Sequence, residues 1–496
     1  MNTAYAHPIL TCAEAKDLEA RLFGADESKE WAAMQAAGAA VAGAVLADFE
    51  EVGGFPATGT ILVLAGKGHN GGDALLAAAQ ILRQHPRAHA EVWLVYGVRA
   101  LRPLALRAWQ ELQHAAPERV KAVTGRSLRR RYALSLDGVF GYQFRPPLDE
   151  RATAALRLAN LLDVRLRAAV DLPSGWDAPE AFRADFTYAT GIVKAPLLNL
   201  PNAGRRRYLD LGFFAGDEPG GDRVLTASVL APLRAWRDPH ADKRKNGHVF
   251  ILGGSRDYPG AVFMAVLAAV RSGVGLVSAF VPESLVPAFA AKVPEAIWVG
   301  CPETPDGGLA LEGRHRVVER WSRATALVVG PGLGREKETQ ALVADLLKTA
   351  SVPAVVDADA LQPEIIRAAK TPLILTPHAG EFARIAGDRS LPDYAATTKA
   401  TVVLKGPVTR IAIGAATIHS FFGGPVLARG GSGDLLAGLI GAQLAQTPAD
   451  PAGAASRGVA WHGLAADALA RAKGSTAVRT TQVLGYLGVV LRTAEA

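Results

Sequence analysis

Residues 430–441 read Gly-Gly-Ser-Gly-Asp-Leu-Leu-Ala-Gly-Leu-Ile-Gly, a glycine-rich turn that runs into an apolar, helix-like segment. Such a turn directs several backbone N–H groups at one point, and the helix dipole adds positive potential there, which suits a phosphoryl group in transfer. A carboxylate would repel a resting phosphate, but Asp434 suits this place if it takes a proton from an attacking hydroxyl. Taken alone, the stretch is also compatible with a loop closed by an N-cap aspartate.

The composition is that of a packed globular protein with more than one domain. A chain of 496 residues is too long for one ordinary core. Hydrophobic residues make up 49% of it and charged residues 20%, a composition that argues against disorder. The two cysteines, Cys12 and Cys301, lie far apart, which favours a reducing compartment, and we expect the cytoplasm. We expect no signal peptide, and no membrane span because no run of about 18 apolar residues occurs.

The chain carries a formal net charge of +7, part of it in short basic clusters. These clusters lie in different segments and lack interleaved aromatic residues, so attraction of a polyanionic small molecule, or a solvated face, is favoured over nucleic-acid binding. The clusters are Arg126 with Arg129–Arg131, Arg205–Arg207 and Lys243–Lys245.

Short apolar runs alternate with helical patterns along the chain, which predicts parallel α/β sheets. In the first half we expect helices within 11–50 and at 75–82, and strands at 61–65, 92–96 and 168–170. The segment 214–224 is rich in glycine and proline and has no apolar period, so it is the best candidate linker. We therefore expect two α/β domains, residues 1–213 and 225–496.

Six turns that carry glycine or acidic residues follow predicted strands of the second half. We expect those strands at 249–252, 274–280, 326–329, 354–356, 373–375 and 402–404. The carboxyl ends of parallel strands meet at one edge of the sheet, where ligands bind in open α/β folds. The turns are Gly253–Ser255, Gly330–Gly334, Asp357–Ala360, Thr376–Glu381, Lys405–Pro407 and Gly430–Asp434. Their number and order predict a ligand site.

In these turns the second half resembles the ADP/ATP-dependent NAD(P)H-hydrate dehydratases, which have a ribokinase-like fold. Further matching segments are Tyr258–Ala261, Val293–Glu295 and His462–Gly463. The resemblance implies dehydration of the S hydrate of NADH or NADPH, a damaged cofactor with an extra hydroxyl at C6. Phosphoryl transfer from ADP or ATP makes that hydroxyl a phosphate leaving group, whose departure restores the double bond of the dihydropyridine.

The resemblance also implies roles for individual residues of this half. Asp434 would be the base for the hydrate hydroxyl, within an anion hole formed by Gly431, Ser432 and Gly433. Asp357 and Asp359 would either bind the Mg²⁺ of the nucleotide or cap a turn. The residues implied to line the nucleotide site are Lys405, Gly406, Pro407, Val408 and Thr409. Those implied to contact the hydrate are Ala261, Gly332 and His378, the last of which is otherwise a helix-cap residue before Glu381.

A second glycine-rich turn, Gly66–Asp73, follows a predicted strand and precedes a helix, and predicts a backbone cradle for a diphosphate. An acidic turn, Asp171–Gly175, follows the strand at 168–170. With Asp137 and the turn Asp210–Gly212, these features resemble the NAD(P)H-hydrate epimerases. That family implies a Rossmann-like three-layer sandwich that interconverts the R and S hydrates. Fusion of such a domain to the dehydratase is a known arrangement.

The second resemblance implies a potassium site and a hydrate site. Asn70, Asp137 and Ser174 would hold K⁺ through hard oxygen ligands. Asp171 would be the base, with a turn cap before Pro173 as the alternative. The residues implied to contact the hydrate are His69, Asn70, Gly71, Gly72, Asp73, Gly141, Tyr142, Gln143, Phe144, Arg145, Pro146, Pro147 and Asp171. Asp73 is also a candidate helix N-cap.

Both halves depart from the family patterns. In the epimerase half the departures are His69 for Asn, Ala74 for Gly, Lys67 for a small residue and residues 141–143 for Gly-Thr-Gly. Tyr142 and Gln143 add bulk where backbone should approach the ligand, so we expect reduced or altered epimerase activity. In the other half Arg429 replaces a usual Thr, and we expect it to add a phosphate contact or to narrow the adenine side.

The sequence therefore predicts a bifunctional enzyme that repairs hydrated NADH and NADPH, with ADP (or ATP), Mg²⁺ and K⁺ as cofactors. We expect small-molecule partners, no nucleic acid and no membrane, and a homo-oligomer. Two alternatives stay open. The second half resembles small-molecule kinases of the ribokinase superfamily in its glycine-rich loop, and the first half is also compatible with an inactive ligand-binding scaffold.

Overall fold

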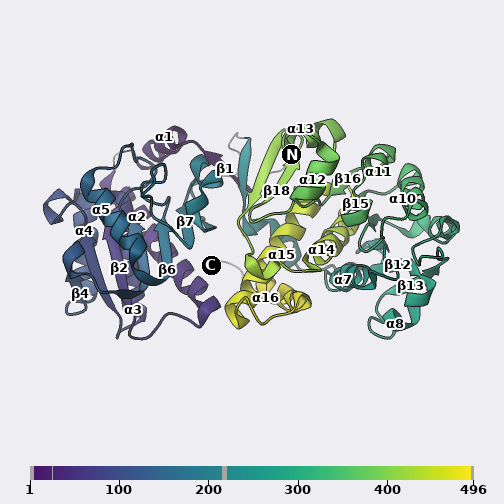
Figure 1. The fold of residues 1–496 in the computed structure, drawn as a ribbon, viewed down its shortest axis with the longest axis horizontal. Coiled ribbons are helices and arrows are strands. Elements are labelled where there is room, and N and C mark those ends of the chain that lie inside the picture. The colour runs from purple at the N-terminus through teal and green to yellow at the C-terminus, as the bar shows by residue number, and fades with distance from the viewer. Residues whose placement is uncertain (1–4, 25, 215–220, 493–496) are drawn as a thin grey trace. The chain divides into compact units, whose positions relative to one another are not determined.

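The computed structural model describes residues 5–24, 26–214 and 221–492. The chain forms two compact units, an N-terminal unit made mainly of residues 7–214 and a C-terminal unit made mainly of residues 221–470 and 475–492 (Figure 1). Of the predicted linker 214–224, residues 215–220 lie outside the described residues. Asp222–Leu225 form strand β10, so the final residues of the predicted linker are part of a sheet.

The N-terminal unit is built on a sheet of seven parallel strands in the order β4-β3-β2-β5-β6-β7-β9. These strands are β2 (Thr60–Ala65), β3 (His89–Leu94), β4 (Val120–Ala122), β5 (Arg131–Gly138), β6 (Asp163–Val170), β7 (Phe186–Thr190) and β9 (Arg205–Leu209). A separate short pair joins β1 (Ala6–Leu10) to β8 (Val193–Lys194). The strand that we expected at 92–96 corresponds to β3, which ends at Leu94.

Helices cover both faces of this sheet because its strands are apolar on both sides. Ile61 and Val63 of β2 pack into one core, while Leu62 and Leu64 pack into the other, as the two-residue repeat of a strand requires. The helices are α1 (Cys12–Phe23), α2 (Glu27–Phe49), α3 (His69–Gln84), α4 (Pro103–Ala115) and α5 (Glu150–Leu161). The first core contains α2, α3 and α4 residues and the second contains α5 residues, which gives three layers.

The segment Glu27–Val52, which contains α2, is long and apolar enough to cross a membrane by length and composition. Its apolar residues Val41, Val45 and Phe49 are nevertheless fully buried in the core that α2 shares with α3. Such packing is typical of a core helix in a globular unit.

The C-terminal unit has a mixed sheet whose strands follow the order β13-β12-β11-β14-β15-β16-β17-β18-β19-β10. Its strands from β11 to β17 are parallel, and β18 pairs antiparallel with both β17 and β19. They are β11 (His248–Leu252), β12 (Leu276–Pro282), β13 (Ile297–Cys301), β14 (Ala326–Val329), β15 (Ala354–Val356), β16 (Leu373–Leu375), β17 (Thr401–Leu404), β18 (Thr409–Ile413) and β19 (Ala416–Ser420). The parallel strands confirm the predicted α/β class, whereas the antiparallel hairpin was not expected.

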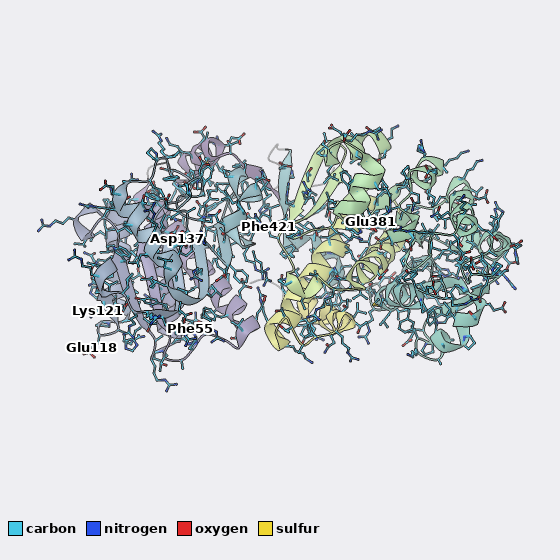
Figure 2. The ribbon with its side chains drawn as sticks, in the orientation of Figure 1. Phe55, Glu118, Lys121, Asp137, Glu381 and Phe421 are labelled. Atoms are coloured by element: carbon cyan, nitrogen blue, oxygen red, sulfur yellow. The ribbon has the colours of Figure 1, made fainter. Side chains whose placement is uncertain are left out.

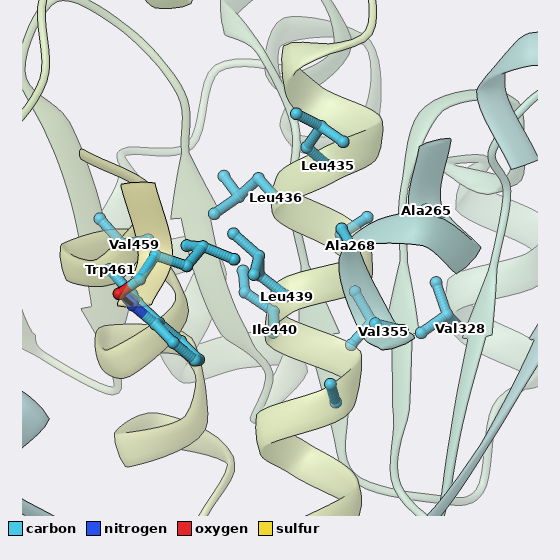
Figure 3. Close-up of a cluster of buried hydrophobic side chains, with 14 of the residues drawn as sticks. Ala265, Ala268, Val328, Val355, Leu435, Leu436, Leu439, Ile440, Val459 and Trp461 are labelled. Carbon is cyan, nitrogen blue, oxygen red and sulfur yellow. Dashed lines mark hydrogen bonds between the residues drawn. The ribbon is translucent and has the colours of Figure 1, made fainter. Parts of the chain in front are cut away.

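Helix α14, which starts in the motif at 430–441, runs through the core of this unit. Leu435, Leu439 and Ile440 pack with Ala265 of α7 and with Trp461 of α15 (Figure 3). The helices of the unit are α6 (Ala231–Arg234), α7 (Pro259–Val270), α8 (Val286–Ala290), α9 (Arg314–Val318), α10 (Lys337–Thr349), α11 (Pro363–Ala368), α12 (Ala379–Ala386), α13 (Leu391–Thr398), α14 (Ser432–Gln446), α15 (Pro451–Lys473) and α16 (Leu487–Arg492). Burial of nearly every α14 side chain explains why its sequence is apolar all round.

Each sheet reverses its strand order at one point, and this point positions a site. In the N-terminal unit the order reverses between β2 and β5, and in the C-terminal unit between β11 and β14. At such a switch point the loops beyond the two strands turn in opposite directions and leave a crevice, where open α/β sheets bind ligands. Both glycine-rich regions singled out in the sequence adjoin these points.

Candidate active sites

The N-terminal unit contains a cavity of about 600 Å³ at its switch point. The turns after β2 and β5 meet there, where Gly66 N donates a hydrogen bond to Gly138 O at 3.1 Å. A Cβ on Gly66 would lie 1.9 Å from Val139 O, so this approach requires glycine. The predicted hydrate contacts that line the cavity are His69, Asn70, Asp73, Gly141, Tyr142, Gln143, Phe144, Arg145, Pro147 and Asp171.

Three of the predicted contacts lie elsewhere. Gly71 and Gly72 are buried inside α3, where a Cβ would come within 2.6 Å of Gly66 O or of Met34 Sδ, respectively. These two glycines therefore let α3 pack closely against the turn before it and against α2. Pro146 is exposed and is not part of the cavity wall.

Asp171 is held at the cavity wall by a buried ion pair. Its Oδ1 atom lies 2.6 Å from Lys194 Nζ, and both side chains are less than a tenth exposed. Its Oδ2 atom accepts a hydrogen bond from Tyr142 N at 3.1 Å. The backbone of Asp171 has φ +66°, a left-handed conformation that is unfavourable for a non-glycine residue and is typical of functional sites. The carboxylate is oriented by two partners and is not a turn cap.

The bulky residue Tyr142 lies beside Asp171 in the cavity wall. The close approach to the carboxylate is made at Gly141, where a Cβ would lie 3.1 Å from Asp171 Oδ2. The phenol of Tyr142 donates to Glu19 Oε2 at 2.5 Å, and its ring centroid lies 5.0 Å from Lys194 Nζ. The side chain therefore forms part of the cavity wall beside the ion pair.

Two further carboxyl groups line the same cavity. Burial raises the pKa of Glu19, against the opposing charge of Lys194. Burial, reinforced by the charge of Asp171, raises the pKa of Asp73 well above its ordinary value. Asp73 is the fifth residue of α3, whose N-cap is Gly68, so the predicted N-cap role of Asp73 is wrong. The helix begins at His69, five residues earlier than that role requires.

The predicted potassium ligands come together below the cavity, within the N-terminal unit where Figure 2 labels Asp137. Ser174 Oγ lies 2.6 Å from Asp137 Oδ1 and 3.2 Å from Phe140 O, and Asn70 Nδ2 donates to Phe140 O at 2.8 Å. Burial raises the pKa of Asp137 to about 6, although hydrogen bonds from Ser174 oppose the rise. A buried carboxylate among hydroxyl and carbonyl oxygens fits a weakly bound hard cation.

The C-terminal site is organised by a second buried ion pair. Lys405 Nζ lies 2.9 Å from Asp357 Oδ1, which also accepts from Thr376 Oγ1 at 2.8 Å. Glu381 Oε2 is 4.0 Å from the same ammonium. Burial by itself would lower the pKa of Lys405, but the charge and hydrogen bond of Asp357, with the charges of Glu381 and Asp434, together outweigh it and the net pKa is raised. Asp357 pairs with a lysine and makes no cap hydrogen bond, so its predicted cap role is wrong.

Asp434 lies in the first turn of α14, near this pair. Burial, with the added repulsion of Asp357, raises the pKa of Asp434 to about 6, and the charge of Lys405 opposes the rise. The ammonium is also adjacent to the helix start, because a Cβ on Gly433 would lie 3.2 Å from Lys405 Nζ. One positive charge and the N-terminal amides of α14 thus surround a carboxyl group that is ready to accept a proton near neutral pH.

Glycines allow close packing at the start of α14 and in the turns after β11 and β14. Gly431, at the N-cap of α14, has φ +85°, and a Cβ there would lie 2.3 Å from Met264 Cε. Gly332, with φ +67°, lies beside Ala261, whose Cβ would be 3.0 Å from one added to the glycine. The turns after β11 and β14 also join here, since Gly254 N donates to Pro331 O at 2.8 Å. The structure therefore brings together Ala261 and Gly332, which the resemblance implied as hydrate contacts.

The remaining predicted residues belong to the loops around this centre. Lys405–Val408 form the turn between β17 and β18, and Thr409 is the first residue of β18. His378 is the N-cap of α12, and its Nδ1 accepts from Gly380 N at 3.0 Å and Glu381 N at 3.2 Å. Its side chain is 61% exposed, so the cap leaves the outer edge of the ring open to solvent.

Arg429 has a structural role that the sequence did not predict. Its guanidinium donates to the carbonyl oxygens of Ser475, Thr476 and Val478 at 2.7–3.0 Å. The predicted phosphate contact is therefore not supported: these hydrogen bonds tie the start of the glycine-rich loop to the segment after α15. Asp359 accepts from Gly334 N at 3.1 Å and thereby stabilises the neighbouring glycine turn.

Lys194 and Glu19 are among the residues of the N-terminal cavity that sequence reasoning missed. A signal for Lys194 was present, because it stands alone among apolar residues in the run Gly191–Leu198, and a charged residue in a buried strand needs a partner. Glu19 lies in α1 and carried no such signal. Only the fold brings α1 to the cavity.

Comparison with known proteins agrees with this arrangement. The family model described as YjeF-related protein N-terminus matches residues 31–195, and the model described as NAD(P)H-hydrate dehydratase matches residues 249–487. A bifunctional NAD(P)H-hydrate repair enzyme Nnr from Moorella thermoacetica is 33% identical, with 88% of each chain covered. One from Gloeobacter violaceus is 36% identical, with 95% of each chain covered.

A single-activity relative matches the second half only. The ADP-dependent (S)-NAD(P)H-hydrate dehydratase of Xanthomonas campestris pv. campestris is 38% identical over 51% of this chain and 90% of its own. Two family models in sequence order, and relatives that share nearly the whole length, show that this chain belongs to the family of bifunctional NAD(P)H-hydrate repair enzymes.

Proposed function

We propose that the C-terminal unit dehydrates the S hydrate of NADH or NADPH with MgADP as phosphoryl donor. The observation that carries this proposal is the position of Asp434, a carboxyl group with a pKa of about 6 beside Lys405 at the N-terminus of α14. The name of the Xanthomonas relative supports ADP as the donor. Lys405–Thr409 and Gly431–Gly433 would bind the nucleotide, and Ala261, Gly332 and His378 the hydrate.

The proposed reaction has two steps. Asp434 takes the proton of the C6 hydroxyl while its oxygen attacks the terminal phosphoryl group of ADP, and AMP departs. The amides at the start of α14 and the Lys405 ammonium stabilise the negative charge on the transferring group. The C6–O bond then breaks, phosphate leaves with the electron pair, and loss of a C5 proton forms the C5=C6 double bond.

The N-terminal unit is proposed to interconvert the R and S hydrates, so that both forms reach the dehydratase. Asp171 is the proposed base, at the wall of a cavity large enough for the hydrated nicotinamide and part of its nucleotide. The free thiols of Cys12 and Cys301 fit a reducing cytoplasm, which is the proposed location.

Asn70, Asp137 and Ser174 are proposed to hold K⁺, which would balance the charge of the buried Asp137 and stiffen the floor of the cavity. The test is the thermal midpoint of unfolding in KCl against N-methylglucamine chloride at equal ionic strength. Wild type is expected to be stabilised by K⁺, and Asp137→Asn to lose that difference. Equal midpoints for wild type in both salts would rule out the potassium site.

The decisive assay mixes R and S hydrate with ADP and, in parallel, ATP, and follows the return of NADH absorbance. Complete conversion with ADP is expected, because epimerisation feeds the S-specific step. Conversion that stops at the S fraction would show an inactive N-terminal scaffold. Accumulation of a stable phosphorylated product would identify the C-terminal unit as a small-molecule kinase.

A further inference from the structure

Lys194 is the cation at the centre of the N-terminal cavity, and no motif in the sequence assigned it a role. It ends the short strand β8, its side chain is 3% exposed, and it lines the cavity directly beside Asp171. The 2.6 Å contact with Asp171 Oδ1 uses one of the three N–H groups of its ammonium. The others are available to a molecule in the cavity.

Acidic and aromatic groups surround this lysine. Besides Asp171, the carboxyl groups of Glu19 and Asp73 lie close enough to interact electrostatically with Lys194. The face of the Tyr142 ring, 5.0 Å from Nζ, adds a further attraction for a cation. A buried ammonium among acidic groups is a proton donor held in place at the cavity wall.

Asp171 alone does not supply what epimerisation needs. Both of its oxygens accept hydrogen bonds, from Lys194 and from Tyr142 N, so as a carboxylate it is an acceptor and not a donor. The hydroxyl at C6 is a poor leaving group until it is protonated. A site that removes this hydroxyl and restores it on the other face requires a group that gives a proton and takes it back.

We propose that Lys194 is a catalytic residue of the epimerase site and donates the proton to the departing C6 hydroxyl, an inference that rests on the epimerase function proposed above. The C6–O bond breaks as the lone pair of the ring nitrogen N1 forms an N1=C6 iminium, and the proton from Lys194 Nζ completes a water molecule. Water then adds to the opposite face of C6, and Asp171, the proposed base, takes its surplus proton and passes it to the amine of Lys194. No atom or electron is gained or lost overall.

The test follows R-to-S interconversion in the full chain without ADP, by chromatographic separation of the two hydrates, so that the dehydratase does not contribute. Lys194→Met is expected to slow interconversion at least 100-fold, in line with the usual effect of a general acid. Lys121→Met, an exposed lysine of β4 in the same unit, is the matched control and should retain the wild-type rate.

Chemical rescue separates proton donation from packing. Lys194→Cys is prepared in a Cys12→Ala background, because Cys12 lies near Lys194 and would also be alkylated. Treatment with 2-bromoethylamine restores an ammonium at position 194. We expect it to raise the interconversion rate of the untreated Cys variant at least 10-fold, whereas iodoacetamide should not raise it. The Cys12→Ala parent, treated in the same way, controls for alkylation of Cys301.

Wild-type-like interconversion by Lys194→Met, or equal rates after the two reagents, would overturn the assignment of Lys194. Failure of the wild-type chain to interconvert the hydrates would instead overturn the proposed epimerase function. The two failures are therefore distinguishable in one series of measurements.

Discussion

At the scale of single residues, Asp434 shows how a group proposed to be catalytic opposes stability. Because its pKa in the folded protein is raised to about 6, the native state binds its proton more tightly than the unfolded chain does. Its contribution therefore makes the free energy of unfolding fall as pH rises from about 4 to about 6, and the deficit persists at neutral pH.

Asp434→Asn removes both the proposed base and this deficit. We expect the ADP-dependent return of NADH absorbance from the S hydrate to fall by about 10²–10⁴-fold, while the thermal midpoint at pH 8 equals or exceeds that of wild type. In wild type the same rate should fall as pH drops through about 6, where the carboxylate becomes protonated. Near-normal turnover by the variant would refute the role of Asp434 as base.

The ion pair between Lys405 and Asp357 makes a different prediction. Lys405→Met leaves the buried Asp357 carboxylate without its cation, which typically costs about 3–5 kcal/mol when one partner of a buried pair is removed. Loss of the ammonium also removes the charge that lowers the pKa of Asp434. We expect a lower midpoint in urea and an activity profile displaced to higher pH. Lys348→Met, on the exposed side of α10, should change neither.

At the scale of elements, the start of α14 depends on one glycine more than on its neighbour. Gly431 has φ +85° and a Cβ there would meet Met264 at 2.3 Å, whereas nothing lies within 4 Å of a Cβ at Gly430. We expect Gly431→Ala to lose about 1–3 kcal/mol of stability and to raise the KM for ADP, and Gly430→Ala to be as stable as wild type. Equal urea midpoints for both variants would show that the loop tolerates a side chain at either position.

The turn at 141–143 departs from its family pattern, and one of its residues makes the close contact with Asp171. Tyr142 is a bulky residue at a position where the backbone should approach the ligand, and we expected it to hinder that approach. In the structure only Gly141 makes the close approach to Asp171, while the Tyr142 phenol is directed to Glu19. The approach of backbone to Asp171 is thus preserved, because the two neighbouring positions have different steric demands.

At the scale of the whole molecule, the two units carry separable activities in one chain. Asp171→Asn is expected to block use of the R hydrate alone, so a mixed sample with ADP should convert to the extent of its S fraction and then stop. Asp434→Asn should block conversion of both hydrates but leave their interconversion intact. Undiminished conversion of both hydrates by Asp171→Asn would mean that the epimerase site lies elsewhere. The measurement is the final yield of NADH, compared with the rate of interconversion without ADP.

Much of this architecture could be predicted from local sequence. The strands Ala326–Val329, Ala354–Val356 and Leu373–Leu375 coincide with the predicted ranges, because buried parallel strands are uninterrupted apolar runs bounded by turns. The antiparallel hairpin of β18 and β19 was missed, although Ile411–Ile413 is an apolar run as long as Ala354–Val356. Lys194 and Glu19 were missed because their role arises from contacts between segments far apart in the chain.

The sequence by itself determined the α/β class and the two glycine-rich turns, and it marked Asp171 and Asp434 as candidate bases, because backbone cradles and strand ends are local properties of the chain. Only the tertiary structure decided which charges meet: Lys405 beside Asp357 and Asp434, and Lys194 beside Asp171. It also showed that the Arg429 guanidinium donates hydrogen bonds to backbone carbonyl oxygens, and that Asp73 lies within α3 and not at its N-cap. The physical reason is that burial and electrostatic neighbours depend on segments that approach each other only after the sheets have formed.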